Sequence, residues 1–193
     1  MEHTQLISDV RRLTESLGQF PDPVAEPVFI AVSGLPGTGK SYFCSKLAER
    51  LPFIILESDA LRKVLFSPPS YSSQESSRLF RACHLLIERL LERGISLILD
   101  ATNLSERYRE RLYHIADRLE AKLILVRVEA PPRVVRERLN TRRGDSGNKS
   151  DAGWEVYQRM KPAVQKIRRN HYAVDTSRDV TPVLDKIVRE VKR

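Results

Sequence analysis

The sequence contains few of the features that form disulfide bonds, bind structural metals or span a membrane. It has two cysteines in 193 residues, Cys44 and Cys83, too few for a disulfide framework and without the spacing of metal ligands. We expect both to be reduced thiols, which are most often buried. Nearly uncharged apolar runs such as 28–32 and 53–56 are far shorter than the ~20 residues that span a bilayer. These absences argue against a disulfide scaffold and predict no membrane segment.

The first residues, MEHTQLISDVRR, lack the basic stretch and apolar run of a secretory signal. We therefore expect a cytoplasmic protein that does not act at a membrane. Aromatic residues are also sparse, at 7% with one Trp, and only Tyr71 and Tyr108 lie near the motifs below. Few aromatic side chains are thus available to stack on nucleic-acid bases.

Arginine is abundant by contrast. The chain carries 33 Lys and Arg against 25 Asp and Glu, a formal charge of +8. The guanidinium group is a planar fork that suits phosphate oxygens. This surplus is compatible with a nucleic-acid partner, a nucleotide site or a solvated basic surface.

Apolar strand patterns alternate with helical patterns along most of the chain. We predict strands at 28–33, 53–57, 95–99, 122–128 and 172–175, and helices at 39–51, 72–93, 105–119, 131–141, 154–169 and 182–191. Such alternation indicates right-handed crossovers, a five-stranded parallel sheet and a three-layer α/β/α sandwich. Residues 1–27 stand apart as a helix at 4–18 and a linker with three prolines, which leaves one domain at 28–193. We expect the helix to pack on that domain.

Ligands of such sheets bind outside the carboxyl ends of the strands. After the first strand, GLPGTGKS fits G-x-x-x-x-G-K-[ST], the P-loop or Walker A motif. Its glycines let backbone N–H groups converge on phosphate oxygens, and the helix that follows adds its positive end. The predicted ATP-binding residues here are Gly34, Gly37, Thr38, Gly39, Lys40, Ser41 and Tyr42. Lys40 should reach the β- and γ-phosphates, and the Ser41 hydroxyl should ligate Mg²⁺.

Other strand ends indicate what the nucleotide is used for. The chain has no N-K-x-D segment typical of GTPases, and its third strand ends in ILDATN without the adjacent glutamate of many ATPases. Asp59 follows the second strand, where a carboxylate could accept the proton of an acceptor hydroxyl. The alternative role for Asp59 is to cap a helix that begins at Ala60.

Asp100 closes the third strand and is the predicted second Mg²⁺ ligand. Its alternative is a loop-capping role. Thr102 and Asn103 follow, and they either orient the acceptor or cap the helix near Ser105.

Residues 136–153 change from an arginine-rich helix to a Gly/Ser/Asn segment without apolar anchors. This pattern is typical of a mobile lid that brings guanidinium groups over the phosphates and excludes water. The candidate catalytic arginines are Arg138, Arg142 and Arg143, with Arg142 also a candidate ATP contact. The alternative is a solvated basic face before a loop.

With these motifs, residues 28–191 resemble P-loop phosphotransferases of the polynucleotide-kinase and zeta-toxin type, including small bacterial AAA-type kinases. The resemblance rests on SGLPGTGKS, ESDALRKVLF, LILDATNLSERYRERL, EAPPRVVRERLNTRR and HYAVDTSRDV. It implies that Asp59 is the general base and that Arg62 contacts a substrate phosphate. It also implies that Asp100 lies near the metal and that the adenine lies beside Asp175, Thr176 and Arg178. The fused phosphatase or ligase domain of many polynucleotide kinases has no counterpart here, and SD-x-x-R also recurs in kinases of small alcohols and sugars.

The leading hypothesis is an ATP- and Mg²⁺-dependent kinase that phosphorylates a hydroxyl. The candidate acceptors are the 5′-hydroxyl of a polynucleotide and a hydroxyl of a small metabolite, nucleotide or antibiotic. Two hypotheses from other classes are a nucleotide-dependent switch without transfer and an ATPase whose acceptor is water.

Overall fold

The computed structural model describes residues 2–142 and 153–193, and its centre is a parallel sheet. The strands are β1 (Val28–Ser33), β2 (Ile54–Glu57), β3 (Leu97–Asp100), β4 (Lys122–Glu129) and β5 (Tyr172–Asp175). Their order is β2-β3-β1-β4-β5, and all pairs are parallel. The strand that carries the glycine-rich motif is therefore central. The predicted five-stranded parallel sheet is confirmed.

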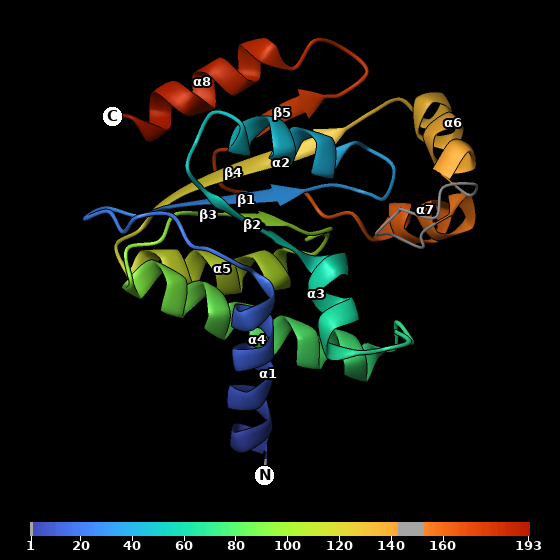
Figure 1. The fold of residues 1–193 in the computed structure, drawn as a ribbon. Coiled ribbons are helices and arrows are strands. Elements are labelled where there is room, and N and C mark those ends of the chain that lie inside the picture. The colour runs from blue at the N-terminus through green and yellow to red at the C-terminus, as the bar shows by residue number, and fades with distance from the viewer. Residues whose placement is uncertain (1, 143–152) are drawn as a thin grey trace.

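Helices cover both faces of this sheet, as the three-layer prediction requires (Figure 1). The α-helices are α1 (Glu2–Ser16), α2 (Lys40–Ala48), α3 (Ser58–Leu65), α4 (Ser73–Glu92), α5 (Glu106–Arg118), α6 (Pro132–Arg142), α7 (Trp154–Met160) and α8 (Thr181–Val191). Ser72 and Ser105 cap α4 and α5, because their side chains accept hydrogen bonds from the N–H groups of Glu75 and Tyr108. None of the described helices is long and apolar enough to cross a membrane.

Two apolar cores lie on opposite faces of the sheet. One holds Phe29, Leu56 and Leu99 against the side chains of α1, α3, α4 and α5. The other holds Ile30 and Val126 against α2 and α8. Alternate residues of β1 enter alternate cores, which is the period-two pattern of a strand covered on both faces.

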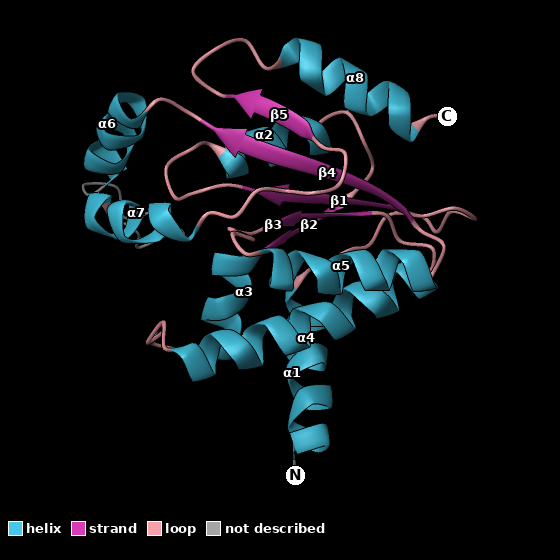
Figure 2. Cartoon of the chain, turned by 180° about the vertical axis from the view of Figure 1, so that it is seen from behind, coloured by secondary structure: helices cyan, strands magenta, loops and turns pink. Residues whose placement is uncertain are grey.

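The carboxyl ends of the strands point toward α3, α6 and α7 (Figures 1 and 2). The loops that follow β1, β2 and β3 therefore meet at one end of the molecule, together with those helices. This is the edge at which parallel sheets bind their ligands.

Helix α1 packs on α4 and α3 rather than on the sheet. It buries Val10 and Leu13 completely in the core that those helices form. Its Asp9 carboxylate accepts two hydrogen bonds from the guanidinium of Arg78 on α4, both at 2.7 Å. An apolar face and a bidentate ion pair thus hold the N-terminal helix against α3 and α4.

The helix predicted at 154–169 is wrong over its second half. α7 ends at Met160, a short 3₁₀ turn (Lys161–Ala163) follows, and the chain then runs without helix to β5. Pro162 has no N–H to donate within a helix. Arg109, almost fully buried, donates to the carbonyls of Gln165 and Lys166 at 2.9 and 3.0 Å. These carbonyls are therefore satisfied by a side chain instead of a helical ladder.

Candidate active site

The P-loop motif, residues 34–41, joins the central strand β1 to α2 and includes the first two residues of that helix, and its backbone requires glycine. Gly37 and Gly39 have φ of 78° and 90°, conformations that residues with a Cβ rarely adopt. At Gly34 the constraint is space, because a Cβ there would lie 2.4 Å from the carbonyl oxygen of Val128. α2 begins at Lys40, so its unpaired N–H groups open toward the loop.

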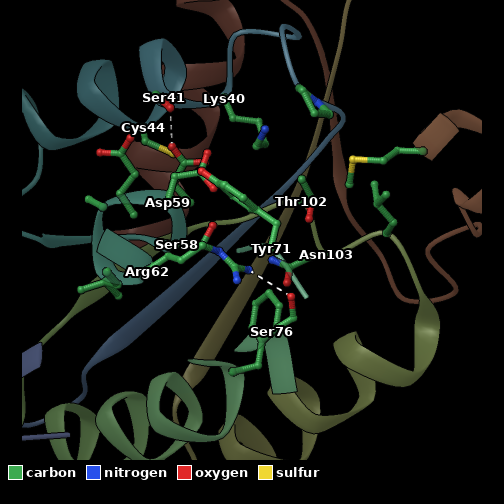
Figure 3. Close-up of a pocket in the computed structure, with 18 of the residues that line it drawn as sticks. Lys40, Ser41, Cys44, Ser58, Asp59, Arg62, Tyr71, Ser76, Thr102 and Asn103 are labelled. Atoms are coloured by element: carbon green, nitrogen blue, oxygen red, sulfur yellow. Dashed lines mark hydrogen bonds between the residues drawn. The ribbon is translucent and has the colours of Figure 1, made fainter. Parts of the chain in front are cut away.

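Lys40, Ser41 and Asp100 meet at the end of the central strands. The Ser41 hydroxyl donates to Asp100 Oδ2 at 2.6 Å (Figure 3). Lys40 Nζ donates to the carbonyl of Leu35 within its own loop at 3.3 Å. Asp100 is 3% exposed, and this burial raises its pKa, an effect that Lys40 and the Ser41 hydrogen bond oppose.

This pair suits a magnesium ion. Mg²⁺ prefers oxygen ligands and is usually held by one or two protein groups together with waters and substrate phosphates. A serine hydroxyl and a buried carboxylate in direct contact provide such a pair beside the phosphate-binding loop. Within the described residues no cluster of three or more His, Cys, Asp or Glu competes for a metal.

Asp59 lies in the first turn of α3, which begins one residue after β2. The cap position of this helix is Glu57, so the alternative that Asp59 caps a helix starting at Ala60 is not supported. Parallel pairing of β2 with β3 sets Glu57 opposite Asp100. Asp59 therefore reaches the same edge of the sheet as the Ser41–Asp100 pair.

A cavity of about 1180 Å³ connects these groups. Its walls come from the P-loop, α3, the loop after β3, and α7 with the turn that follows. The predicted site residues that line it are Gly37, Gly39, Lys40, Ser41, Asp59, Arg62, Asp100, Thr102 and Asn103. The nucleotide motif, both predicted metal ligands and the candidate base therefore face one space.

Arg62 lines this cavity but is already engaged. It is 7% exposed, and its Nη1 donates to Glu75 Oε1 at 2.7 Å. The Tyr71 ring lies over the same guanidinium, with 5.0 Å from Cζ to the ring centroid. Burial raises the pKa of Glu75, but hydrogen bonds from Arg62 and Ser70 outweigh it and bring the pKa to about 2. Glu75 is therefore a carboxylate that fixes Arg62 in place.

Thr102 and Asn103 bind the protein backbone as well as line the cavity. The Thr102 carbonyl accepts from Gly34 N–H at 3.2 Å, which ties the loop after β3 to the P-loop. Asn103 has φ of 44°, and its Nδ2 donates to the carbonyl of Val32 at 3.4 Å. Neither residue caps α5, because Ser105 does.

Arg138 lies in a separate cluster beside the P-loop. Its guanidinium donates to the hydroxyl and carbonyl of Thr176 at 2.8 and 2.9 Å and to the carbonyl of Thr38 at 3.4 Å. The Thr176 hydroxyl also donates to Thr38. Three predicted ATP or phosphate contacts thus meet, but outside the lining of the large cavity.

Three further predicted site residues, Tyr42, Asp175 and Arg178, are not among the residues that line the cavity. Tyr42 is 54% exposed on α2. Asp175 accepts hydrogen bonds from Ser177 and pairs with the exposed Arg178 at 3.6 Å. Arg143 and most of the predicted lid, 143–152, lie outside the described residues. Arg142 ends α6, and the structure describes nothing of its side chain. The roles of these residues stay predictions.

Several residues in or beside the cavity were missed from the sequence. Glu75, which pairs with Arg62 but does not itself line the cavity, could have been found, because Ser72-x-x-Glu75 has the spacing of a capping box. Arg159 on α7 and Phe80 on α4 line the cavity. The Phe80 and Tyr108 rings are in contact, tilted by 34° with 5.6 Å between their centroids. No local pattern marks these residues, since only the packing of α4, α5 and α7 brings them together.

A family model described as an AAA domain matches residues 29–167. The chain belongs to this AAA domain family. The matched span holds the P-loop, Asp59, Asp100 and α6, and it leaves α1, β5 and α8 outside. None of the curated proteins compared matches the chain.

Solved structures share the fold of this AAA domain at low sequence identity. Chaetomium thermophilum Kti12 in complex with ADP-AlF3 is 21% identical with a TM-score of 0.65, covering 82% of this chain and 96% of that one. The Mycobacterium tuberculosis APS kinase CysC in complex with AMPPNP and APS is 15% identical with a TM-score of 0.63, covering 89% and 100%. A gluconokinase from Sinorhizobium meliloti 1021 is 20% identical with a TM-score of 0.60, covering 86% and 96%. These likenesses establish a P-loop α/β fold.

Proposed function

We propose that this AAA domain protein is an ATP- and Mg²⁺-dependent kinase that transfers the γ-phosphate of ATP to a hydroxyl group. The observation that carries the proposal is the shared cavity. The P-loop with Lys40, the Ser41–Asp100 pair and Asp59 on α3 all line it. The kinases with this fold, a gluconokinase and an APS kinase, add support.

The nucleotide half of the mechanism uses the P-loop. Its N–H groups and the start of α2 bind the phosphates, and the Lys40 ammonium binds the β- and γ-phosphates once it leaves the Leu35 carbonyl. Ser41 and Asp100 would hold Mg²⁺, which would supply positive charge to offset the negative charge of the phosphates. Thr38, Thr176 and Arg138 flank the nucleotide.

The acceptor half uses Asp59. The acceptor hydroxyl oxygen attacks the γ-phosphorus while its proton passes to the Asp59 carboxylate. The bond from the γ-phosphorus to the bridging oxygen breaks, and ADP leaves. General-base help of this kind is worth ~10²–10⁴-fold in rate. The arginines proposed to steady the transferred group are Arg138, Arg142 and Arg143.

The acceptor enters from the side of α3, α4 and α7, where Arg62, Phe80 and Arg159 line the cavity. Because Arg62 already pairs with Glu75, a substrate phosphate would have to share that guanidinium. The proposed acceptors are the 5′-hydroxyl of a polynucleotide and the hydroxyl of a small metabolite or antibiotic.

The test is transfer of label from γ-labelled ATP, with Mg²⁺, to each acceptor class. The panel holds 5′-hydroxyl DNA and RNA oligonucleotides, nucleosides, sugars and aminoglycosides. Asp59→Asn should lower the rate of transfer by ~10²–10⁴-fold while ATP still binds, because only the base is lost. Lys40→Ala should weaken ATP binding and abolish transfer.

Label on oligonucleotide ends would identify a polynucleotide as the acceptor. Label on a small alcohol would identify a small molecule as the acceptor. An Asp59→Asn variant that transfers at the wild-type rate would exclude Asp59 as the base. Rapid ATP hydrolysis without an acceptor would identify water as the acceptor. Tight ATP binding with neither transfer nor hydrolysis would favour the switch.

A further inference from the structure

Tyr71 lines the cavity from a backbone position with a positive φ angle. It lies in the connection between α3 and α4, where its φ of 55° is uncommon for a residue with a Cβ. It lines the cavity and is 45% exposed. Figure 3 shows its side chain reaching across the cavity toward Asp59, with Lys40 and Ser41 beyond. A phenol hydroxyl is therefore directed to where an acceptor hydroxyl should bind.

Contacts at both ends of the residue hold this orientation. The Tyr71 N–H donates to Glu75 Oε1 at 3.2 Å, and the ring lies over the Arg62 guanidinium. Arg62 is in turn fixed by Glu75. Asp59 and Arg62 are three residues apart on α3, so they share a helix face. The ring that covers Arg62 is thereby kept beside the candidate base.

We propose that Tyr71 is an internal phosphoryl acceptor, so that the protein phosphorylates its own Tyr71 hydroxyl. This inference rests on the proposed kinase function. It adds a modification site on the chain itself.

The chemistry is that of the proposed reaction with a phenol as acceptor. Tyr71 Oη attacks the γ-phosphorus of ATP and forms a new P–O bond. The bond to the β–γ bridging oxygen breaks, ADP departs with its electron pair, and the phenol proton passes to Asp59. A phenol has a pKa of ~10 and gives up its proton more readily than an aliphatic alcohol.

The product would change the site. A phosphate on Tyr71 adds close to two negative charges at neutral pH, beside Arg62 and within the space that an external acceptor needs. Self-phosphorylation should therefore slow transfer to other acceptors.

The test uses the purified full chain with γ-labelled ATP and Mg²⁺, without and with the acceptor panel. Trypsin should release residues 64–78, which contain Tyr71 and six serines, and fragment ions locate the phosphate within that peptide. We expect it on Tyr71. Tyr71→Phe keeps the ring over Arg62 and should lose this label, as should Lys40→Ala. Tyr108→Phe, which removes another tyrosine hydroxyl from the same cavity, should keep it.

An internal reaction also has a kinetic signature. The fraction of chains labelled per minute should not depend on protein concentration, and a tagged Lys40→Ala copy mixed with wild type should stay unlabelled. Label on a serine, label on the tagged copy, or no label on Tyr71 would each overturn the proposal. Label on an added acceptor is read separately in the same reactions. A kinase that labels the panel but not Tyr71 thus refutes this inference alone.

Discussion

Gly37 and Gly18 have similar positive φ angles in very different surroundings. Their φ values are 78° and 73°. A Cβ at Gly37 would lie 2.8 Å from Leu139 Cγ and 2.9 Å from Val135 Cγ1, both on α6, whereas nothing lies within 4 Å of a Cβ at Gly18. A substitution at Gly18 therefore tests the backbone conformation alone, whereas a substitution at Gly37 also tests the close packing of the P-loop against α6.

We expect Gly37→Ala to destabilise the protein more than Gly18→Ala. The left-handed conformation costs a residue with a Cβ about 1–2 kcal/mol at either position, and crowding against α6 adds about 1–3 kcal/mol at Gly37 alone. Urea unfolding of both variants measures the difference. ATP titration should show weaker binding for Gly37→Ala only. Equal losses of stability for the two variants would mean that α6 shifts to accommodate the added methyl group without a measurable cost in free energy.

The Arg62–Glu75 pair should make the free energy of unfolding fall as the pH is lowered into the acid range. Breaking a buried pair by removing one partner costs about 3–5 kcal/mol, so Glu75→Gln should be that much less stable at neutral pH. The folded-state pKa of Glu75, about 2, lies below its ordinary 4.5. The stabilisation that the ionised Glu75 gives the fold is therefore complete above about pH 5, and it is lost as the pH falls from there to 2.

Urea unfolding of both proteins between pH 7 and 2 tests this assignment. The two stabilities should converge as the pH falls. Ser77→Ala, an exposed change on the same helix, is the control and should follow wild type throughout. A gap that stays constant down to pH 2 would show that Glu75 has the same pKa in the folded and unfolded chains, and that Arg62 does not stabilise its ionised form.

Among the elements, α1 lies outside the family match and yet belongs to the core. Val10 and Leu13 are fully buried against α3 and α4. The buried Asp9 pairs with Arg78, whose hydrogen bonds lower the pKa of Asp9 although burial raises it. Ser16 and Leu17 reach the large cavity, so α1 also forms part of the wall on the acceptor side.

We expect α1 to unfold together with the rest of the molecule. Leu13→Ala should lower the free energy of unfolding by about 2–5 kcal/mol, because it removes a fully buried side chain. Ser8→Ala, on the exposed face of the same helix, should change it by less than about 0.5 kcal/mol. Circular dichroism during thermal unfolding should show one transition for each. A separate early transition in wild type would mean that α1 is only loosely attached.

Most elements could be predicted because local pattern and tertiary packing agree. β1 and β5 have the bounds expected from the sequence, and Ser105 caps α5 as predicted. The exception, 161–169, fails because its carbonyls bind Arg109. That residue is distant in sequence, so no local window contains the information.

In the candidate site, too, some features could be predicted from the sequence and others only from the fold. The sequence points to the P-loop, Asp59 and Asp100 because each lies at or just after the carboxyl end of a strand, and these ends converge in a parallel sheet. Arg62 shows the limit of this reasoning. The resemblance implies that Arg62 contacts a substrate phosphate, but only the fold shows that Glu75 and Tyr71 already contact its guanidinium.

At the scale of the whole molecule, the cavity is assembled from segments between residue 16 and residue 163. A nucleotide bound there should stabilise the entire fold and not one loop. At 100 times its dissociation constant, a ligand that binds only the native state adds about 2.7 kcal/mol. We expect ATP with Mg²⁺ to raise the melting temperature of wild type by calorimetry, and to raise it much less for Lys40→Ala or in EDTA. Equal shifts for wild type and Lys40→Ala would exclude the P-loop as the site.

The central place of β1 has a consequence for biosynthesis. Residues 29–32 pair with 97–100 on one side, and residues 28–33 pair with 122–127 on the other. At ~5–20 residues per second, a ribosome needs several seconds to supply both neighbours after β1 is made. During that interval Phe29, Ile30 and Val32 have no sheet to enter, and such non-local pairing is slow and prone to aggregation. The nascent chain should therefore depend most on chaperones before β4 emerges.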